Sequence, residues 1–199
     1  MAAQAILTMT SEEYLAFERA SQTRHELING VVYAMAGGSE RHASIISNLS
    51  LSIGASVRPK GCRHYTSDMR VKVDESGAYT YPDFVLVCGK PVLEDSRGDS
   101  LLNPILIVEV LSPSTAAYDR GAKFAHYRLI ESLRTYLVVE QESVFVDRYD
   151  RREDGVWTLT SYGKREEILE LPSVGVAVPL AEVYRDIDVP DGPLGMPTA

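Results

Sequence analysis

The sequence predicts an α/β fold in which helices cover both faces of a mixed sheet. The first observation behind this prediction is the segment from Ile105 to Ser112, which is apolar on both faces and rich in β-branched residues, as a covered central strand is. The second is the order of elements from residue 39 onward, which reads helix, strand, strand, strand, helix, strand. A series of short strands after residue 143 predicts a C-terminal β meander that extends the same sheet.

The overall composition is that of a globular protein, with 199 residues of which 45% are hydrophobic and 24% charged. We expect one domain over residues 1–185 and a mobile, Pro/Gly-rich tail over residues 186–199. No apolar run approaches the roughly 18 residues of a membrane span, and the N-terminus lacks the basic flank of a secretory signal. The sequence therefore predicts a cytoplasmic protein without a membrane segment.

The net charge and the cysteines narrow the function classes. A net charge of −8 argues against a surface that coats nucleic acid broadly, although it leaves room for a local basic patch. Cys62 and Cys88 lie far apart, without a Cys-x-x-Cys motif or histidines at zinc-finger spacing. We expect two reduced thiols rather than a zinc site or a disulfide.

The N-terminal part is expected to contain one helix and one strand region. Thr10 followed by Glu13 has the form of a capping box, which predicts a helix that ends near Ala20. A strand is expected over residues 27–35, with a hairpin turn near Asn29-Gly30.

The core elements follow Gly37-Gly38. Ser39 can cap a second helix over residues 40–57, and strands over residues 64–73 and 79–87 are expected to form an antiparallel hairpin. A polar loop over residues 89–103 precedes the central strand. The second helix is supported by apolar residues at helical spacing, namely Ile45, Ile46, Leu49, Ile53 and Val57.

After the central strand, a helix is expected over residues 119–131 and a short apolar strand over residues 135–140. Strands over residues 144–149 and 157–162 form the expected meander. One more strand and a short helix are expected within residues 168–184.

Two acidic residues occupy positions where an apolar side chain would fit. Glu109 is the single charge inside the apolar central strand, and a buried carboxylate costs several kcal/mol unless it is paired, protonated or bound to a cation. Asp83 follows Pro82 and shares a strand face with Val85 and Val87. If the two strands are neighbours, both carboxylates belong to one site.

Paired carboxylates with a backbone carbonyl suit Mg²⁺, a hard cation that takes oxygen ligands and keeps several waters. Such a cation could orient water and neutralise charge on a scissile phosphate. Lys123, on the following helix, borders the core stripe and is a candidate for the nearby positive charge. Tyr127, one turn further, shares that edge.

The combination of Pro82-Asp83 and Glu109-Val110-Leu111, in this order of helices and strands, resembles the PD-(D/E)xK nuclease superfamily, which has a restriction-endonuclease-like fold. A longer pattern, from about Thr10 to Tyr184, resembles the Uma-type restriction endonuclease family. This pattern consists of His25-Glu26-Leu27-Ile28-Asn29-Gly30, His42, Glu109-Val110-Leu111-Ser112-Pro113-Ser114-Thr115, Lys123 and Tyr127.

The resemblance implies that Asp83, Glu109 and the carbonyl of Val110 hold Mg²⁺ or Mn²⁺ and that the protein hydrolyses DNA phosphodiester bonds. Leu111 stands where the general superfamily motif places a lysine. In the Uma-type pattern the lysine lies on the following helix, where Lys123 stands. Cleavage of both DNA strands calls for two active sites, which makes a homodimer the expected assembly.

Simpler roles remain open for each residue. Asp83 could be a residue at the start of a strand that accepts a hydrogen bond within a turn. Glu109 could belong to a buried ion pair, and Lys123 could be an ordinary solvated helix residue. Glu26 is either an outer metal ligand or a solvent-facing acid, and His42 either contacts water or phosphate in the cleft or caps its helix. Tyr127 is either an accessory site residue or a packing residue.

In an alternative interpretation, the protein has the same fold but no catalytic activity. In that case the protein is a nucleic-acid-binding or protein-interaction module whose acids are structural. The net negative charge and the leucine at position 111 favour this alternative.

Overall fold

The computed structural model describes residues 5–35, 37–113 and 115–192. Its main sheet has six strands in the order β12-β11-β10-β9-β7-β4. Strands β9 and β10 run parallel and the other neighbours are antiparallel, so the sheet is mixed and the expected α/β class is confirmed. These strands are β4 (Cys62–Thr66), β7 (Phe84–Cys88), β9 (Leu106–Leu111), β10 (Thr135–Glu140), β11 (Val146–Arg151) and β12 (Trp157–Tyr162).

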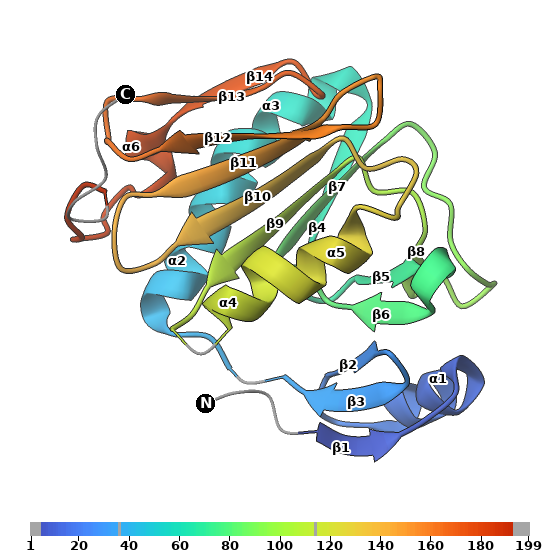
Figure 1. Ribbon diagram of the computed structural model, residues 1–199. Helices are drawn as coiled ribbons and strands as arrows, with labels where there is room; N and C mark the ends of the chain where they lie inside the picture. The colour runs from blue at the N-terminus through green and yellow to red at the C-terminus, as the bar shows by residue number, and fades with distance from the viewer. Residues whose placement is uncertain (1–4, 36, 114, 193–199) are drawn as a thin grey trace.

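A second sheet lies beneath the main sheet, together with helix α1 (Ser11–Ala20) (Figure 1). The predicted capping box of Thr10 and Glu13 is present at the start of this helix. The predicted hairpin turns at Asn29 and Gly30, which both have positive φ angles, 51° and 77°. The sheet order is β1-β3-β2-β6-β5-β8, with β1 (Ala5–Thr8), β2 (His25–Ile28), β3 (Val31–Ala34), β5 (Arg70–Val73), β6 (Ala78–Thr80) and β8 (Ser100–Leu101).

The expected hairpin over residues 64–73 and 79–87 is divided between the two sheets. Strands β4 and β7 pair in the main sheet, whereas β5 and β6 pair in the second sheet. A turn separates β4 from β5, and it is closed by a 3.0 Å hydrogen bond from the Met69 amide to the Thr66 carbonyl. Pro82, which has no amide hydrogen to continue a ladder, separates β6 from β7. Asp83 therefore lies where the chain enters the main sheet.

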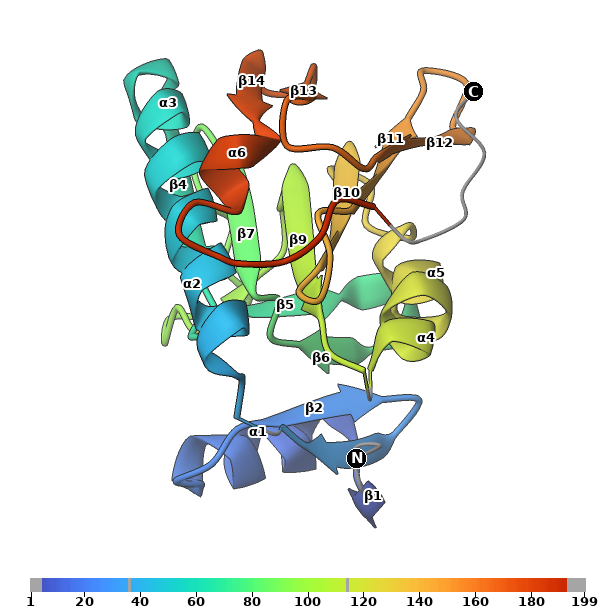
Figure 2. The same ribbon diagram turned by 90° about the vertical axis from the view of Figure 1, so that its left-hand side faces the viewer.

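One long helix packs on one face of the main sheet and a shorter one on the other (Figure 2). The long helix spans the predicted residues 40–57 as α2 (Glu40–Leu49), a π-helical turn (Ser50–Gly54) and α3 (Ala55–Val57), and it ends in a 3-10 turn (Arg58–Lys60). The shorter helix starts and ends earlier than the expected residues 119–131. It consists of α4 (Ala116–Tyr118), a π-helical turn (Asp119–Lys123) and α5 (Phe124–Tyr127).

The remaining elements are a 3-10 turn (Asp74–Ser76) and, at the C-terminal end, the hairpin of β13 (Ile168–Leu171) and β14 (Val176–Pro179) with helix α6 (Leu180–Val183). Ile187 and Val189 are buried against the main core, and residues 193–199 lie outside the described part of the chain. The domain boundary expected at residue 185 stays a prediction. In the described residues, no helix combines the length and the apolar character that a membrane crossing requires.

The strand β9 is buried on both faces, as expected for the centre of a covered sheet. Val108 packs in the same cluster as Ile45 and Leu49 of α2, whereas Ile107 packs on the opposite face with Tyr127. Alternation along the strand places Glu109 on the same face as Ile107. The buried acid therefore faces the helix that carries Lys123.

The prediction of two reduced thiols is wrong, because Cys62 and Cys88 form a disulfide. The two residues are separated by 26 positions in the sequence, but they are direct partners in the antiparallel pairing of β4 with β7. Their proximity follows from strand register, which cysteine spacing alone does not reveal.

Candidate active site

Asp83 and Glu109 lie at neighbouring positions of the main sheet. Phe84 pairs with Val108 in the antiparallel register of β7 and β9, so the residues immediately beyond this pair are the two acids. The Val110 amide donates a 2.8 Å hydrogen bond to Oδ2 of Asp83. Both acids are buried, with 8% of Asp83 and 4% of Glu109 exposed. The structure thus brings together the two acids that the sequence singled out.

Lys123 contacts Glu109 from the helix that follows β9. Its Nζ lies 2.9 Å from Oε1 of Glu109 and 3.1 Å from Oε1 of Glu26, and only 5% of the residue is exposed. The hydroxyl of Tyr127 donates a 2.7 Å hydrogen bond to the same Glu109 oxygen. The ammonium and the phenol together fix the position of the Glu109 carboxylate.

Glu26 comes from the second sheet. Its Oε1 accepts a 3.0 Å hydrogen bond from the Tyr81 amide as well as the contact from Lys123. The side chain is buried, so Glu26 is not a solvent-facing acid. The site is therefore assembled between the two sheets, at the point where the chain passes from one to the other.

His42, near the start of α2, lies 3.1 Å from Oδ2 of Asp83 through its Nε2. Burial alone would lower the pKa of His42, but the hydrogen bond and charge of Asp83 outweigh burial and raise it above its ordinary value. The Val110 backbone contributes in the same direction. His42 thus lies in the cleft as a partner of Asp83, a contact that neither of the two roles left open by the sequence included.

The side chains of Glu26, His42, Asp83, Glu109 and Lys123 line one cavity of about 430 Å³, whose lining does not include Tyr127. It lies at the carboxyl end of β9 and β10, which run parallel, and beside the first turn of α2. The lining residues that sequence reasoning did not single out include Tyr118, Asp119 and Gln141. Gln141 could have been found, because the carboxyl ends of neighbouring parallel strands commonly carry functional residues.

Asp119 was missed because the helix was expected to begin there. Its Oδ1 lies 3.8 Å from Nζ of Lys123, four residues further along. The cavity therefore contains four carboxylates, of Glu26, Asp83, Glu109 and Asp119, around a single lysine and a single histidine.

Burial and the excess of carboxylates shift the pKa values of the ionisable groups in the cavity. Burial raises the pKa of Glu109 well above its ordinary value; Lys123 opposes this shift, whereas Asp83, Asp119 and Glu26 add to it. Burial also raises the pKa of Asp119. For Lys123, burial acts to lower the pKa, but Glu109 and Glu26 outweigh it and keep the side chain an ammonium ion. Burial and the charge of Glu109 raise the pKa of Tyr127, so its phenol remains a hydrogen-bond donor.

The donor set suits a hard divalent cation. Carboxylate oxygens of Asp83 and Glu109 lie beside the Val110 backbone, and the excess negative charge in a buried cavity is what a bound cation would compensate. In the described residues, no three His, Cys, Asp or Glu side chains are grouped as a metal site. A metal held by two carboxylates and one carbonyl would need water or substrate oxygens to complete its coordination.

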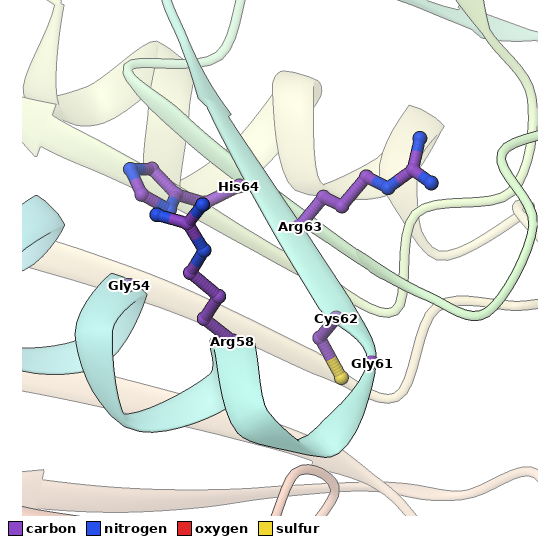
Figure 3. A pocket seen from close by; sticks show the side chains of 6 residues that line it. All are labelled: Gly54, Arg58, Gly61, Cys62, Arg63 and His64. Carbon is purple, nitrogen blue, oxygen red and sulfur yellow. The ribbon is translucent and has the colours of Figure 1, made fainter.

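A second hollow lies at the far end of the long helix, about 460 Å³ in volume (Figure 3). Its lining includes Arg58, Arg63, His64 and the disulfide-bonded Cys62, and contains no acidic residue. Burial lowers the pKa of His64, so its imidazole is neutral at neutral pH. This hollow therefore lacks the carboxylates on which the candidate active site depends.

Comparisons with known proteins agree with the geometry. Two proteins of a Synechocystis strain, both described as uncharacterised, are similar over most of their length. One is 36% identical over 180 residues, covering 90% of this chain and 93% of the relative. The other is 35% identical over 161 residues, covering 80% of this chain and 91% of the relative.

A solved structure from Anabaena variabilis, described as a putative nuclease, has the same fold with a TM-score of 0.74. It covers 88% of this chain and 97% of its own, at 16% sequence identity. The model of the Uma2 family, described as "Putative restriction endonuclease", matches residues 11–181, which include every candidate site residue. The chain belongs to the Uma2 family of restriction-endonuclease-like proteins.

Proposed function

We propose that the protein is an endonuclease that depends on a divalent metal ion and hydrolyses DNA phosphodiester bonds. The observation that carries this proposal is the buried contact of the Lys123 ammonium with Glu109, in a cavity that also contains Asp83. Two carboxylates can hold a metal ion and a lysine can stabilise charge on a phosphate, so this set suits metal-assisted phosphodiester hydrolysis.

Each residue has a role in this proposal. Asp83, Glu109 and the Val110 carbonyl would hold Mg²⁺ or Mn²⁺, which when bound would polarise the phosphate and make a water molecule more acidic. Lys123 supplies a fixed positive charge for the negative charge that develops on the phosphate. Tyr127 and His42 are positioning residues, since they hold Glu109 and Asp83 through the hydrogen bonds described above. Glu26 is a positioning residue for Lys123.

The test is cleavage of supercoiled and linear DNA by the purified protein with Mg²⁺ or Mn²⁺. We expect nicking or cutting that EDTA abolishes, and we expect Asp83→Asn, Glu109→Gln and Lys123→Ala each to remove it. Glu166→Gln is a matched control, because Glu166 is exposed and distant in sequence from the site. Cleavage that persists undiminished in all three site variants would refute the proposal.

A module without catalysis is the second candidate. Leu111, buried at the position where the general superfamily motif has a lysine, favours it, as do the contacts that pair Glu109 with Lys123 and Asp83 with His42 inside the protein. Calorimetric titration with Mn²⁺ separates the two functions. Metal binding that Asp83→Asn abolishes supports the enzyme, whereas no binding supports the module.

Two finer points belong to the same proposal. We expect a homodimer, because cleavage of both strands requires two active sites. Sedimentation velocity with and without a DNA duplex measures the oligomeric state directly.

The cytoplasmic location expected from the sequence would give the enzyme access to DNA.

A further inference from the structure

Gln141 is a buried amide in the wall of the candidate active site. It directly follows β10, whose last residue, Glu140, pairs with Leu111 at the end of β9. Only 4% of Gln141 is exposed, and it lines the same cavity as Asp83 and Glu109. Parallel strands thus deliver Gln141 to the edge of the sheet that also carries the acids.

One end of this amide is held by the protein. The Ser39 hydroxyl donates a 2.5 Å hydrogen bond to Oε1 of Gln141. The same hydroxyl oxygen accepts the backbone amide of His42, as the N-cap of α2. Because the Ser39 oxygen is already an acceptor, its single hydrogen is available for Gln141. The carbonyl end of the amide is therefore turned toward Ser39, and the NH₂ end away from it.

The NH₂ end has no acceptor within the described residues, 5–35, 37–113 and 115–192. Nε2 is not among the buried side-chain atoms that lack a partner in the described residues, so it is accessible to solvent. Because Gln141 is otherwise buried and lines the cavity, this access is from the cavity, which is large enough to admit a ligand. An acceptor supplied by that ligand would complete the hydrogen bonding of Gln141.

The neighbouring groups indicate what kind of acceptor this would be. Gln141 lies at the N-terminal end of α2, a helix of ten residues, where backbone N–H groups favour an anion. His42, three residues into the same helical turn, lines the same cavity. Arg41 is engaged with Glu142 at 2.6 Å, so the neutral amide is the donor available at this edge. A phosphate oxygen fits a neutral donor at a helix N-terminus.

We propose that Gln141 is a substrate-binding residue, which donates from Nε2 to a non-bridging oxygen of a DNA phosphate next to the one that is cleaved. The inference rests on the proposed function, since it names the group by which that site holds its substrate. Ser39 is the positioning residue for this contact, because it sets the direction of the amide.

The decisive variant is Gln141→Met, which removes the donor without adding charge. Gln141→Glu also removes the N–H donors and keeps an oxygen that can accept the Ser39 hydroxyl, but it adds a buried charge to the cavity. The matched control is Gln22→Glu, which makes the same chemical change at an exposed position outside the cavity.

Binding of a fluorescein-labelled DNA duplex is measured by anisotropy with Ca²⁺, and melting temperature is measured on the same samples. We expect Gln141→Glu and Gln141→Met to weaken Kd about tenfold or more. Gln141→Glu should also lower the melting temperature, because it adds a buried charge beside four carboxylates, so the affinity of Gln141→Met decides. Gln22→Glu should bind as the unmodified protein does. Ser39→Ala should weaken binding by a smaller factor, because the amide loses its orientation but keeps its donors.

The outcomes separate this inference from the proposed function. If the unmodified protein cleaves and binds DNA while both Gln141 variants bind equally well, the inference is wrong and the proposed function stands. If the variants lose affinity only in proportion to a lowered melting temperature, Gln141 is a structural residue and the inference is again wrong. If the unmodified protein neither binds nor cleaves DNA, the inference and the proposed function both fail.

Discussion

Replacing Lys123 with methionine tests the electrostatics of the site without any assumption about its substrate. Methionine retains most of the length and apolar contact of the lysine stem but removes the ammonium. Glu109 and Glu26, both buried, then lose the cation that lies 2.9 and 3.1 Å from their oxygens. The replacement therefore leaves a cluster of acids that no lysine compensates.

The size of the effect follows from this burial. Removing one partner of a buried ion pair costs about 3–5 kcal/mol, because the remaining charge stays buried without compensation. For a chain of this size, each kcal/mol corresponds to roughly 2–4 °C in melting temperature, so we expect a decrease of roughly 6–20 °C at neutral pH. Lys164→Met, at an exposed lysine, should change stability by less than about 0.5 kcal/mol.

The stability lost in the Lys123→Met variant should depend on pH and on the presence of Glu109. Burial raises the folded-state pKa of Glu109 above its unfolded value, so the stability of the Lys123→Met variant should be highest at acid pH and fall as the pH rises through that folded pKa. Adding Glu109→Gln removes the titrating group and should restore part of the lost stability. Urea unfolding of both single variants and the double variant gives the coupling energy directly.

Two results would refute this reasoning. One is a Lys123→Met variant that is no less stable than Lys164→Met. The other is strict additivity of Lys123→Met and Glu109→Gln, since residues in direct contact should show a coupling of about 0.5–3 kcal/mol.

Two further predictions concern His42 and the disulfide. The folded-state pKa of His42 is raised because Asp83 outweighs burial, so its stabilising contact is complete below its ordinary pKa of about 6.5 and is lost as the pH rises through the folded value. The difference in urea midpoint between the unmodified protein and His42→Gln should therefore be larger at about pH 5.5 than at about pH 9, and a difference that grows with pH would contradict it. Denatured, unreduced protein should show no thiols toward Ellman's reagent, and reducing Cys62–Cys88 should cost about 3 kcal/mol; two titratable thiols would contradict the disulfide.

Local signals were sufficient for most elements of the fold. The capping box at Thr10, the Asn29-Gly30 turn and the apolar spacing of the long helix each depend on residues within a few positions of one another. Two-faced burial of β9 could be predicted because both of its faces are apolar in sequence. Long-range pairing could not be predicted in this way. The division of one hairpin between two sheets and the opposition of Cys62 and Cys88 depend on register, which local propensity does not encode.

The candidate site was predictable to a similar extent. Asp83, Glu109 and Lys123 were found because a charge in an apolar pattern is conspicuous, and the structure places them together. Glu26 was harder to assign, because its burial results from packing between the two sheets rather than from its own strand. Asp119 stands at the boundary between α4 and the π-helical turn, where sequence patterns give the least information.

The π-helical turn Asp119–Lys123 has a consequence for how this site can change. A π turn accommodates one residue more than the α-helix around it, which is the expected mark of a single inserted residue. Gly121, at the centre of the turn, has no neighbouring atom within 4 Å of where a Cβ would lie, so a side chain at this position would meet open space. Deleting Gly121 would let the helix close as a regular α-helix, with Asp119 and Lys123 three residues apart and still on one face. The π turn thus allows the helix to lose one residue while Asp119, Lys123 and Tyr127 keep the side that faces Glu109.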